Sequence, residues 1–277
     1  MGTLLGAAEI REIAARIGVN PTKKLGQNFV VDANTCRRIV KIADVQNDDI
    51  TLEIGPGLGS LTLALLEISK IVIAVEIDKR LAIELSATAT SHGFDSQQLI
   101  VINEDALTTL TLPLNPTVLV ANLPYNVSVP VLLRILEIFP TIRSGVVMVQ
   151  SEVADRLVAR PNSKNYGSPS VKVTWWADLS SAGNVARQVF WPIPNVDSSL
   201  VRFVRHQAAG EESQRVLTFK VIDAAFAQRR KMLRSALSQI FAGEAERKVL
   251  EAGVDPTVRG ETLLLSDFIS IANTLRA

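Results

Sequence analysis

The sequence predicts an α/β protein with a doubly wound parallel sheet and a small all-helical C-terminal domain. Between residues 50 and 150, short β-branched runs recur, and each is continuously apolar, as in a strand that is buried on both faces. Segments with helical spacing separate these runs, which is the alternation of a doubly wound sheet. Beyond residue 214 the pattern is helical.

The individual elements can be placed along the chain. The runs expected to form parallel strands are 50–54, 71–77, 99–103, 117–122 and 145–150, and the helical segments among them include 60–67, 79–89 and 129–139. Further strand-like runs are 171–176, 184–190 and 198–204. Because no long helix separates the last two runs, they predict an antiparallel hairpin at the edge of the sheet.

Two domains are expected in this chain. With 277 residues, of which 47% are hydrophobic, it exceeds the usual size of a single domain. We expect a large α/β domain over residues 1–207, with a helical extension at its N-terminus. The polar stretch 206–214 lacks apolar periodicity and indicates a linker, and the small helical domain that we expect over residues 208–277 begins within it.

Composition excludes several classes of protein. A single cysteine, Cys36, excludes an intramolecular disulfide, and two histidines, His92 and His206, cannot provide the usual ligand spacings of a zinc site, so we expect no metal. The first residues lack a basic start followed by a long apolar run, and no stretch approaches the length of a membrane span. We therefore expect a cytoplasmic protein that does not cross a membrane, and, without long apolar heptads, a monomer.

A glycine-rich turn and two acidic residues indicate a nucleotide-like cofactor. Gly55, Gly57 and Gly59 follow the first buried strand directly, where the absence of Cβ atoms lets a ligand approach the backbone. Glu76 ends the next strand, in position to accept both hydroxyls of a ribose, and Asp105 follows the third strand, within reach of an adenine amino group. NAD would fit the glycine turn and Glu76 equally well.

The fourth strand ends in a motif that distinguishes the cofactors. Asn122, Leu123, Pro124 and Tyr125 place an amide, a bent backbone and an aromatic ring in the same crevice. The Asn122 oxygen and a backbone carbonyl near Leu123 or Pro124 can accept the two hydrogens of an adenine N6 and make that nitrogen nucleophilic. Tyr125 would stack on the extruded base. This chemistry points to methyl transfer from S-adenosylmethionine.

Blocks along nearly the whole chain resemble those of the ribosomal-RNA adenine N6,N6-dimethyltransferases, the family that includes the kasugamycin-resistance methylase. They are KKLGQNFVVD, LEIGPGLGSLT, VEIDKRL, NEDAL, NLPYNVSVP, MVQSEVADRL, YGSPSVKV, FWPIPNVDSSLVRF and AFAQRRKMLRSAL. The resemblance implies a Rossmann-like methyltransferase sheet. It also implies dimethylation of two adjacent adenines in a hairpin loop near the 3′ end of 16S ribosomal RNA, within small ribosomal subunits.

The resemblance assigns further residues to the site. Gln27, Asn28 and Val30 are expected over the methionine and ribose part of S-adenosylmethionine, and Phe190 is expected to offer an aromatic face opposite Tyr125. Val30 and Val129 stand where leucine and threonine are common in the family. The complete set expected at the cofactor is Gln27, Asn28, Val30, Gly55, Gly57, Glu76, Ile77, Asp105, Ala106 and Asn122.

Local clusters of positive charge favour an RNA partner, although the net charge of the chain is only +1. The residues expected to contact phosphates are Lys23, Lys24, Arg229, Arg230, Lys231 and Arg234. For each residue taken singly, a solvated helix face explains the charge equally well.

Three alternatives remain open on the sequence. A DNA adenine methylase would share the motif from Asn122 to Tyr125, and an erythromycin-resistance methylase, which modifies large-subunit RNA, would share the N-terminal half. A ribosome-assembly factor with secondary methylation is an alternative of another class. The C-terminal block AFAQRRKMLRSAL favours the small-subunit interpretation.

Overall fold

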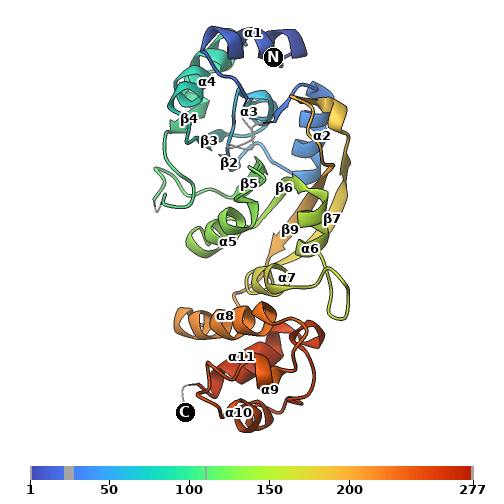
Figure 1. The fold of residues 1–277 in the computed structure, drawn as a ribbon. Helices are drawn as coiled ribbons and strands as arrows, with labels where there is room; N and C mark the ends of the chain where they lie inside the picture. The colour runs from blue at the N-terminus through green and yellow to red at the C-terminus, as the bar shows by residue number, and fades with distance from the viewer. Residues whose placement is uncertain (1, 22–27, 110, 276–277) are drawn as a thin grey trace. The chain divides into compact units, whose positions relative to one another are not determined.

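A computed structural model describes residues 2–21, 28–109 and 111–275, which form two compact units (Figure 1). One unit consists of the chain up to residue 154 together with residues 180–205. The other consists of residues 155–179 together with the chain from residue 206 onward. The large α/β domain expected over residues 1–207 therefore included a segment, 155–179, that belongs to the second unit. Tyr166 and Val171 of this segment lie in the apolar core of the second unit, a long-range pairing that local pattern does not reveal.

A seven-stranded sheet in the order β4-β3-β2-β5-β6-β9-β7 forms the first unit. The first five strands in this order pair in parallel, whereas β9 pairs antiparallel with β6. The predicted α/β class with a doubly wound sheet is confirmed. The strands are β2 (Ile50–Ile54), β3 (Ile71–Val75), β4 (Leu99–Ile102), β5 (Val118–Asn122), β6 (Ser144–Gln150), β7 (Ala177–Val185) and β9 (Ser198–Arg205).

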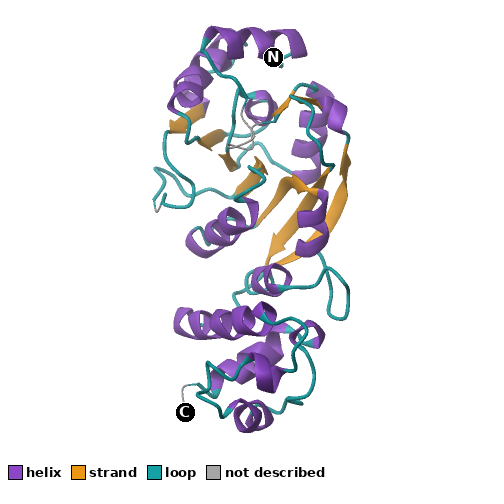
Figure 2. Ribbon diagram, in the orientation of Figure 1, coloured by secondary structure: helices purple, strands orange, loops and turns teal. Residues whose placement is uncertain are grey.

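Helices connect the parallel strands and cover the sheet (Figure 2). Two of them begin at an aspartate cap: Asp32 accepts a hydrogen bond from the Thr35 N–H, and Asp78 accepts one from the Arg80 N–H. The helices of this part of the chain are α1 (Ala7–Arg16), α2 (Ala33–Ala43), α3 (Ser60–Leu66), α4 (Lys79–Ser91), α5 (Ser128–Ile138) and α6 (Ser151–Leu157), with a 3₁₀ turn, η2, at Ser96–Gln98.

The chain order of the strands creates a switch point between β2 and β5. From β2 the chain runs outward through β3 and β4, and then returns to β5 on the opposite side of β2. In sheets of this kind, ligands bind in the crevice at the carboxyl ends of the two strands where the direction reverses. The glycine turn follows β2 and Asn122 ends β5, so both face this crevice.

A two-stranded ribbon closes over the same edge. β1 (Phe29–Val30) pairs antiparallel with β8 (Phe190–Trp191), with Phe29 opposite Trp191 and Val30 opposite Phe190. The run 184–190 was expected to be one strand of a hairpin with 198–204. Instead, it contains the end of β7, a 3₁₀ turn, η3 (Arg187–Val189), and the first residue of β8, while β7 itself is the edge strand next to β9.

The strand expected over residues 171–176 is a helix. α7 (Ser168–Val173) has Pro169 in its first turn, where the fixed φ of proline suits a helix, and the Ser170 hydroxyl accepts a hydrogen bond from the Gly167 N–H. The β-branched residues of this run favour a strand locally. Burial of Val171 in the core of the second unit outweighs that preference.

Beyond residue 206 the described part of the second unit is helical, with α8 (Glu212–Ala227), α9 (Leu233–Ala236), α10 (Ala245–Glu251), η4 (Gly260–Thr262) and α11 (Leu265–Asn273). The sequence pattern predicted helical structure here without placing the breaks between helices, and the structure separates α8 from α9. The break contains Arg229, whose guanidinium donates to the carbonyl of Lys164 and to the carboxylate of Glu261. No helix in the described ranges is long and apolar enough to span a membrane.

A polar network lies at the amino ends of the parallel strands, at the opposite end of β2 from the glycine turn. Asp49 precedes β2, and its carboxylate accepts hydrogen bonds from Arg143 (Nη2–Oδ2 2.9 Å), the Thr117 hydroxyl (2.6 Å) and the Gln46 N–H (2.8 Å). Burial favours a raised pKa for this carboxyl, but the hydrogen bonds outweigh burial and hold its pKa below the usual value. The network ties together the starts of β2, β5 and β6.

We predict that Arg143→Ala lowers the free energy of unfolding at pH 7 by about 1–3 kcal/mol, because it leaves a buried charged carboxylate without its main partner. The side chain of Asp49 is only 4% exposed. The pKa of Asp49 is lower in the folded protein than in the unfolded chain. Its contribution to the free energy of unfolding is therefore present above about pH 4 and is lost as the pH falls further. Urea unfolding at pH 7 and pH 3 checks this, with Arg11→Ala as a control; equal stability of Arg143→Ala and wild type at pH 7 would contradict it.

Candidate functional site

The glycine turn after β2 allows an aromatic ring to lie directly above the backbone. Gly55 and Gly57 have φ angles of 69° and 60°, in the region that favours glycine. A Cβ on Gly57 would lie 2.9 Å from two ring carbons of Phe29, closer than real Cβ contacts allow. Phe29 of β1 therefore packs on the turn only because residue 57 is glycine.

Glu76, at the end of β3, is bonded to the same turn. One carboxylate oxygen accepts a hydrogen bond from the Gly57 N–H (3.1 Å), and the other accepts one from the Asp78 N–H (2.9 Å). Burial raises the pKa of this carboxyl, while the backbone hydrogen bonds oppose the rise. Glu76 thus positions the turn, and its remaining lone pairs can accept hydrogen bonds from a ligand.

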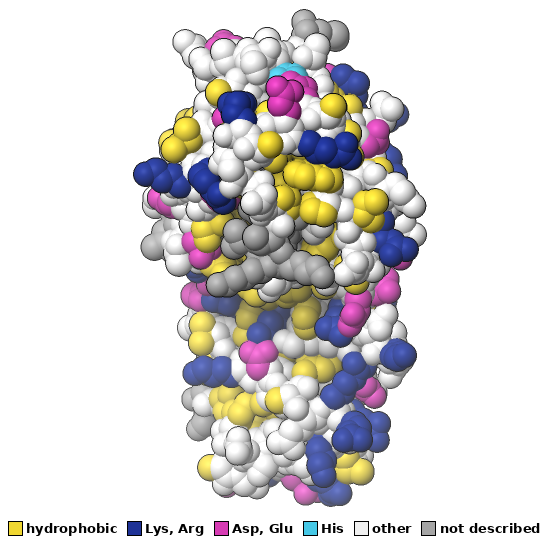
Figure 3. Space-filling view, turned by 45° about the horizontal axis from the view of Figure 1, so that its top comes forward, with side chains coloured by type: hydrophobic (Ala, Val, Ile, Leu, Met, Phe, Trp, Pro, Cys, Tyr) yellow, Lys and Arg dark blue, Asp and Glu magenta, His cyan; other side chains and the backbone are white. Residues whose placement is uncertain are grey.

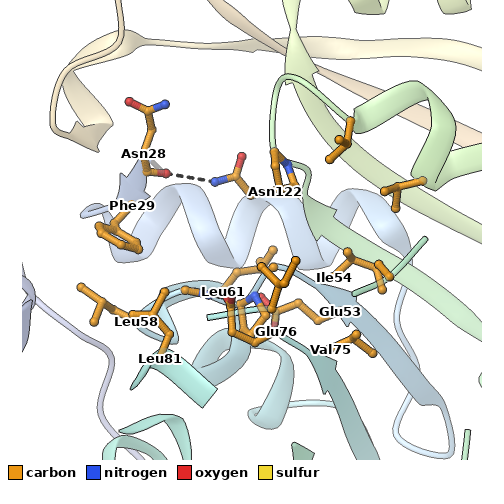
Figure 4. Close-up of a pocket in the computed structure, with 18 of the residues that line it drawn as sticks. Asn28, Phe29, Glu53, Ile54, Leu58, Leu61, Val75, Glu76, Leu81 and Asn122 are labelled. Carbon is orange, nitrogen blue, oxygen red and sulfur yellow. Dashed lines mark hydrogen bonds between the residues drawn. The ribbon is translucent and has the colours of Figure 1, made fainter. Parts of the chain in front are cut away.

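These elements surround a pocket at the carboxyl ends of β2, β3 and β5 (Figure 4). Nine of the residues expected at the cofactor line it: Asn28, Val30, Gly55, Gly57, Glu76, Ile77, Asp105, Ala106 and Asn122. The tenth, Gln27, lies outside the described residues, as do Lys23 and Lys24. Apolar side chains form much of the remaining wall, among them Phe29, Ile54, Leu58, Leu61, Val75, Leu81, Leu107 and Val131.

Asn122 has its side-chain amide fixed by the backbone of Asn28. Its Nδ2 donates a hydrogen bond to the Asn28 carbonyl over 3.1 Å, as the dashed line in Figure 4 shows. This bond assigns the nitrogen to Asn28 and leaves the amide oxygen without a partner among the described residues. The oxygen of Asn122 is therefore an available acceptor at the pocket wall.

The three residues after Asn122 differ in their surroundings. Leu123 is buried and its N–H donates to the Met148 carbonyl, so only its own carbonyl is a candidate for ligand contact. Pro124 lines the pocket, but its carbonyl already accepts the Val127 N–H (3.2 Å). The sequence left the second acceptor open between these two, and both carbonyls stay candidates, because Pro124 lines the pocket and its carbonyl keeps one lone pair, whereas Leu123 does not line the pocket.

Tyr125 is half-buried, and its hydroxyl shares a hydrogen bond of 2.8 Å with the Ser198 hydroxyl at the start of β9. Burial raises the pKa of the phenol, so it is protonated at neutral pH. Tyr125 does not line the pocket itself. It stands beside the pocket, next to Pro124.

Phe190 does not present an open aromatic face in this structure. Its side chain is 2% exposed and belongs to the core of the first unit, because β8 brings it opposite Val30 of β1. Its neighbour Trp191 is half-buried instead and stacks on Phe29, with ring centroids 6.2 Å apart. The family resemblance implies that Phe190 offers an aromatic face opposite Tyr125. For this, the Phe190 ring would have to leave the apolar core and become exposed.

Glu53 is a pocket residue that the sequence analysis missed. It lies in β2, is almost completely buried, and accepts a hydrogen bond of 2.6 Å from the Thr62 hydroxyl. Burial raises the pKa of its carboxyl to about 8, and the nearby charge of Glu76 adds to the rise. A glutamate inside an apolar strand was the available signal, since buried carboxyls are rare.

The basic residues expected to contact RNA have different environments. The Arg229 guanidinium donates hydrogen bonds to the Glu261 carboxylate and the Lys164 carbonyl. Arg234 forms an ion pair with Glu246, with 3.7 Å between Nη1 and Oε1. Arg230 and Lys231 are exposed and have no ion pair among the described residues. In Figure 3, lysine and arginine side chains gather along one edge of the lower part of the view. The described ranges hold no group of three or more acidic, histidine or cysteine side chains that could bind a metal ion.

Comparisons with known proteins match nearly the whole chain. The model of the family described as ribosomal RNA adenine dimethylase matches residues 18–277. The ribosomal RNA small subunit methyltransferase A of Kineococcus radiotolerans is 55% identical in an alignment of 276 residues that covers 98% of this chain and 92% of that protein. The protein of the same name from Leifsonia xyli subsp. xyli is 55% identical in an alignment of 273 residues that covers 97% of this chain and 98% of that protein.

Solved structures resemble the chain as well. A dimethyladenosine transferase from Plasmodium falciparum superposes with a TM-score of 0.73 at 25% identity, covering 88% of this chain and 95% of that one. The 23S rRNA methyltransferase ErmE superposes with a TM-score of 0.65 at 25% identity, covering 90% of this chain and 100% of that one.

We predict that Glu53→Gln stabilises the protein increasingly as the pH rises from 5 to 9. Because the folded pKa of Glu53 lies above its unfolded value, the folded state holds a proton that the unfolded state loses, and wild-type stability falls through this window. The amide resembles the protonated acid and does not titrate. Chemical unfolding should show little difference at pH 5 and a gain of about 1–3 kcal/mol at pH 9. A difference that does not vary with pH would show that Glu53 is ionised in the folded protein.

Proposed function

Because the chain belongs to the ribosomal RNA adenine dimethylase family, we propose that it transfers methyl groups from S-adenosylmethionine to N6 of two adjacent adenines. The adenines lie in a hairpin loop near the 3′ end of 16S ribosomal RNA in small ribosomal subunits, and the product is N6,N6-dimethyladenosine. The observation that carries this proposal is the fixed amide of Asn122, whose oxygen is available at the pocket wall.

The pocket suits S-adenosylmethionine in both shape and chemistry. Gly55 and Gly57 line the pocket with backbone alone, Phe29 packs on Gly57, and Glu76 places a carboxylate where ribose hydroxyls can donate to it. Ile77 and Ala106 provide apolar surface for an adenine ring, with Asp105 beside them to accept from its amino group. When bound, the cofactor supplies an electrophilic methyl group on a sulfonium.

Asn122 activates the acceptor by geometry. The N6 lone pair of adenine is delocalised into the ring and becomes nucleophilic as the nitrogen approaches tetrahedral geometry. In the first transfer the Asn122 oxygen and the carbonyl of Leu123 or Pro124 would accept the two N6 hydrogens and hold the nitrogen in that geometry, and in the second transfer one acceptor would hold the single hydrogen that remains. A bound S-adenosylmethionine would supply the methyl group to this nitrogen, and one N6 proton would be lost in exchange. No strong base is needed, since N6 becomes acidic only as the methyl group transfers.

Tyr125 would hold the target base by stacking. Its ring is oriented by the hydrogen bond to Ser198, and an adenine that leaves its stack in the RNA needs a new aromatic contact. Stacking of this kind contributes about 1–3 kcal/mol per base. Phe190 would add a second face only after rearrangement.

The small subunit is the substrate that the relatives support. Several relatives with 52–55% identity are named as small subunit methyltransferases, which favours this reading over the large-subunit alternative and over an assembly factor with secondary methylation. The exposed Arg230 and Lys231 of the second unit, together with Arg234, would contact RNA phosphates. We infer a monomeric, metal-independent enzyme that acts in the cytoplasm, where ribosomes assemble.

Methyl incorporation tests the proposal directly. Labelled S-adenosylmethionine is supplied with unmethylated small subunits, naked small-subunit RNA or large-subunit RNA, and the RNA is digested to nucleosides. We expect labelled N6,N6-dimethyladenosine from small subunits. Label in large-subunit RNA alone would assign the chain to the erythromycin-resistance type, and no label in any RNA would support the assembly-factor alternative.

We predict that Asn122→Ala lowers the turnover of methyl transfer at least about 100-fold, because the N6 hydrogens lose their oriented acceptor. Binding of S-adenosylmethionine, measured by calorimetry, should change less than about threefold, since Asn122 contributes to one wall only. Asn47→Ala, at the opposite edge of the sheet, is the matched control. Wild-type turnover in Asn122→Ala would refute the proposed role of the amide.

We predict that Tyr125→Phe keeps most of the activity whereas Tyr125→Ala loses about tenfold or more in kcat/KM for the small subunit. Phenylalanine retains the ring and loses only the hydrogen bond to Ser198, while alanine removes the stacking surface. Steady-state kinetics with varied concentrations of the small subunit measures kcat/KM for both variants. Equal losses in the two variants would mean that the hydroxyl, and not the ring, is required.

A further inference from the structure

The loop between β8 and β9, residues 192–197, bridges the two sides of the catalytic crevice. On one side it continues from Trp191, which stacks on the pocket residue Phe29. On the other side it leads into Ser198, which is hydrogen-bonded to Tyr125. The loop therefore runs from a neighbour of the pocket wall to a neighbour of the proposed stacking residue Tyr125, beside the pocket, and none of its residues is part of the pocket lining.

The loop is fixed at its base. Pro194 is buried, Asp197 forms an ion pair with Arg187 over 3.0 Å, and the Asp197 carbonyl accepts the Ser151 N–H over 2.9 Å. Arg187 also donates to the Asn195 carbonyl over 3.4 Å. These contacts hold the backbone of the loop while its tip faces solvent.

Two apolar side chains point outward from this fixed loop. Ile193 is 63% exposed and Val196 is 43% exposed, although Pro194 between them is buried. Exposed apolar side chains scattered over a surface need no explanation, but here two share one anchored loop beside the pocket. The contact that fits them is an apolar surface brought by the substrate.

We propose that Ile193 packs against the nucleobase next to the adenine that occupies the site. This inference rests on the proposed function, in which two adjacent adenines are modified and only one can occupy the site at a time. When the target adenine leaves the stack, its neighbour loses a stacking partner and exposes an apolar face. Ile193 covers that face, as apolar side chains do where proteins unstack bases, and Val196 extends the contact.

Kinetics with small subunits tests the role of Ile193. Ile193→Ser is expected to lower kcat/KM for the subunit about tenfold with the affinity for S-adenosylmethionine unchanged, and Ile193→Leu is expected to restore transfer. Ile83→Ser is the matched control, because Ile83 is equally apolar and 67% exposed on α4. Transfer by Ile193→Ser within twofold of wild type would overturn the proposal.

Photocrosslinking locates the contact independently of turnover. With p-benzoylphenylalanine at position 193, irradiation of the complex with small subunits should crosslink the nucleotide adjacent to a modified adenine, mapped by primer extension. The same amino acid at position 83 should not. A crosslink elsewhere in the RNA, or none, would contradict the role of Ile193. Failure of wild-type protein to methylate small subunits would instead overturn the proposed function.

Discussion

The hydrogen bond from the Asn122 amide to the Asn28 carbonyl joins two parts of the chain that are 94 residues apart. It matters because an asparagine side chain can present either its oxygen or its nitrogen to a ligand, and only the oxygen can accept the hydrogens of an amino group. Two structural elements at the carboxyl ends of the strands bring the two partners of this bond together. β5 brings Asn122 to the switch point, and pairing of β1 with β8 holds Asn28 above it.

The glycine turn depends on the same ribbon. Phe29 follows Asn28 and packs on Gly57, while Glu76 accepts a hydrogen bond from the Gly57 N–H. The proposed cofactor surface and acceptor surface are thus built on one short segment. A displacement of β1 would disturb both surfaces. The site therefore depends on the pairing of β1 with β8, which holds β1 in position.

Sequence reasoning located the sheet and most of the pocket because their signals are local. Buried parallel strands are continuously apolar, and a turn after such a strand faces a predictable crevice, so Gly55, Glu76 and Asn122 could be placed together. The remaining features depend on partners that are distant in sequence. Burial of Val171 in the second unit turned an apparent strand into a helix, and pairing with Val30 buried Phe190. The carboxyl of Glu53 was passed over because an apolar strand was interpreted as core throughout.

The orientation of the Asn122 amide is the central claim, and a high-resolution structure with S-adenosylhomocysteine and a small-subunit RNA hairpin measures it most directly. We expect the N6 atom of the target adenine within about 3 Å of the Asn122 oxygen, with Nδ2 still bonded to the Asn28 carbonyl. An adenine held without contact to Asn122, or an amide released from Asn28 in the complex, would contradict the account.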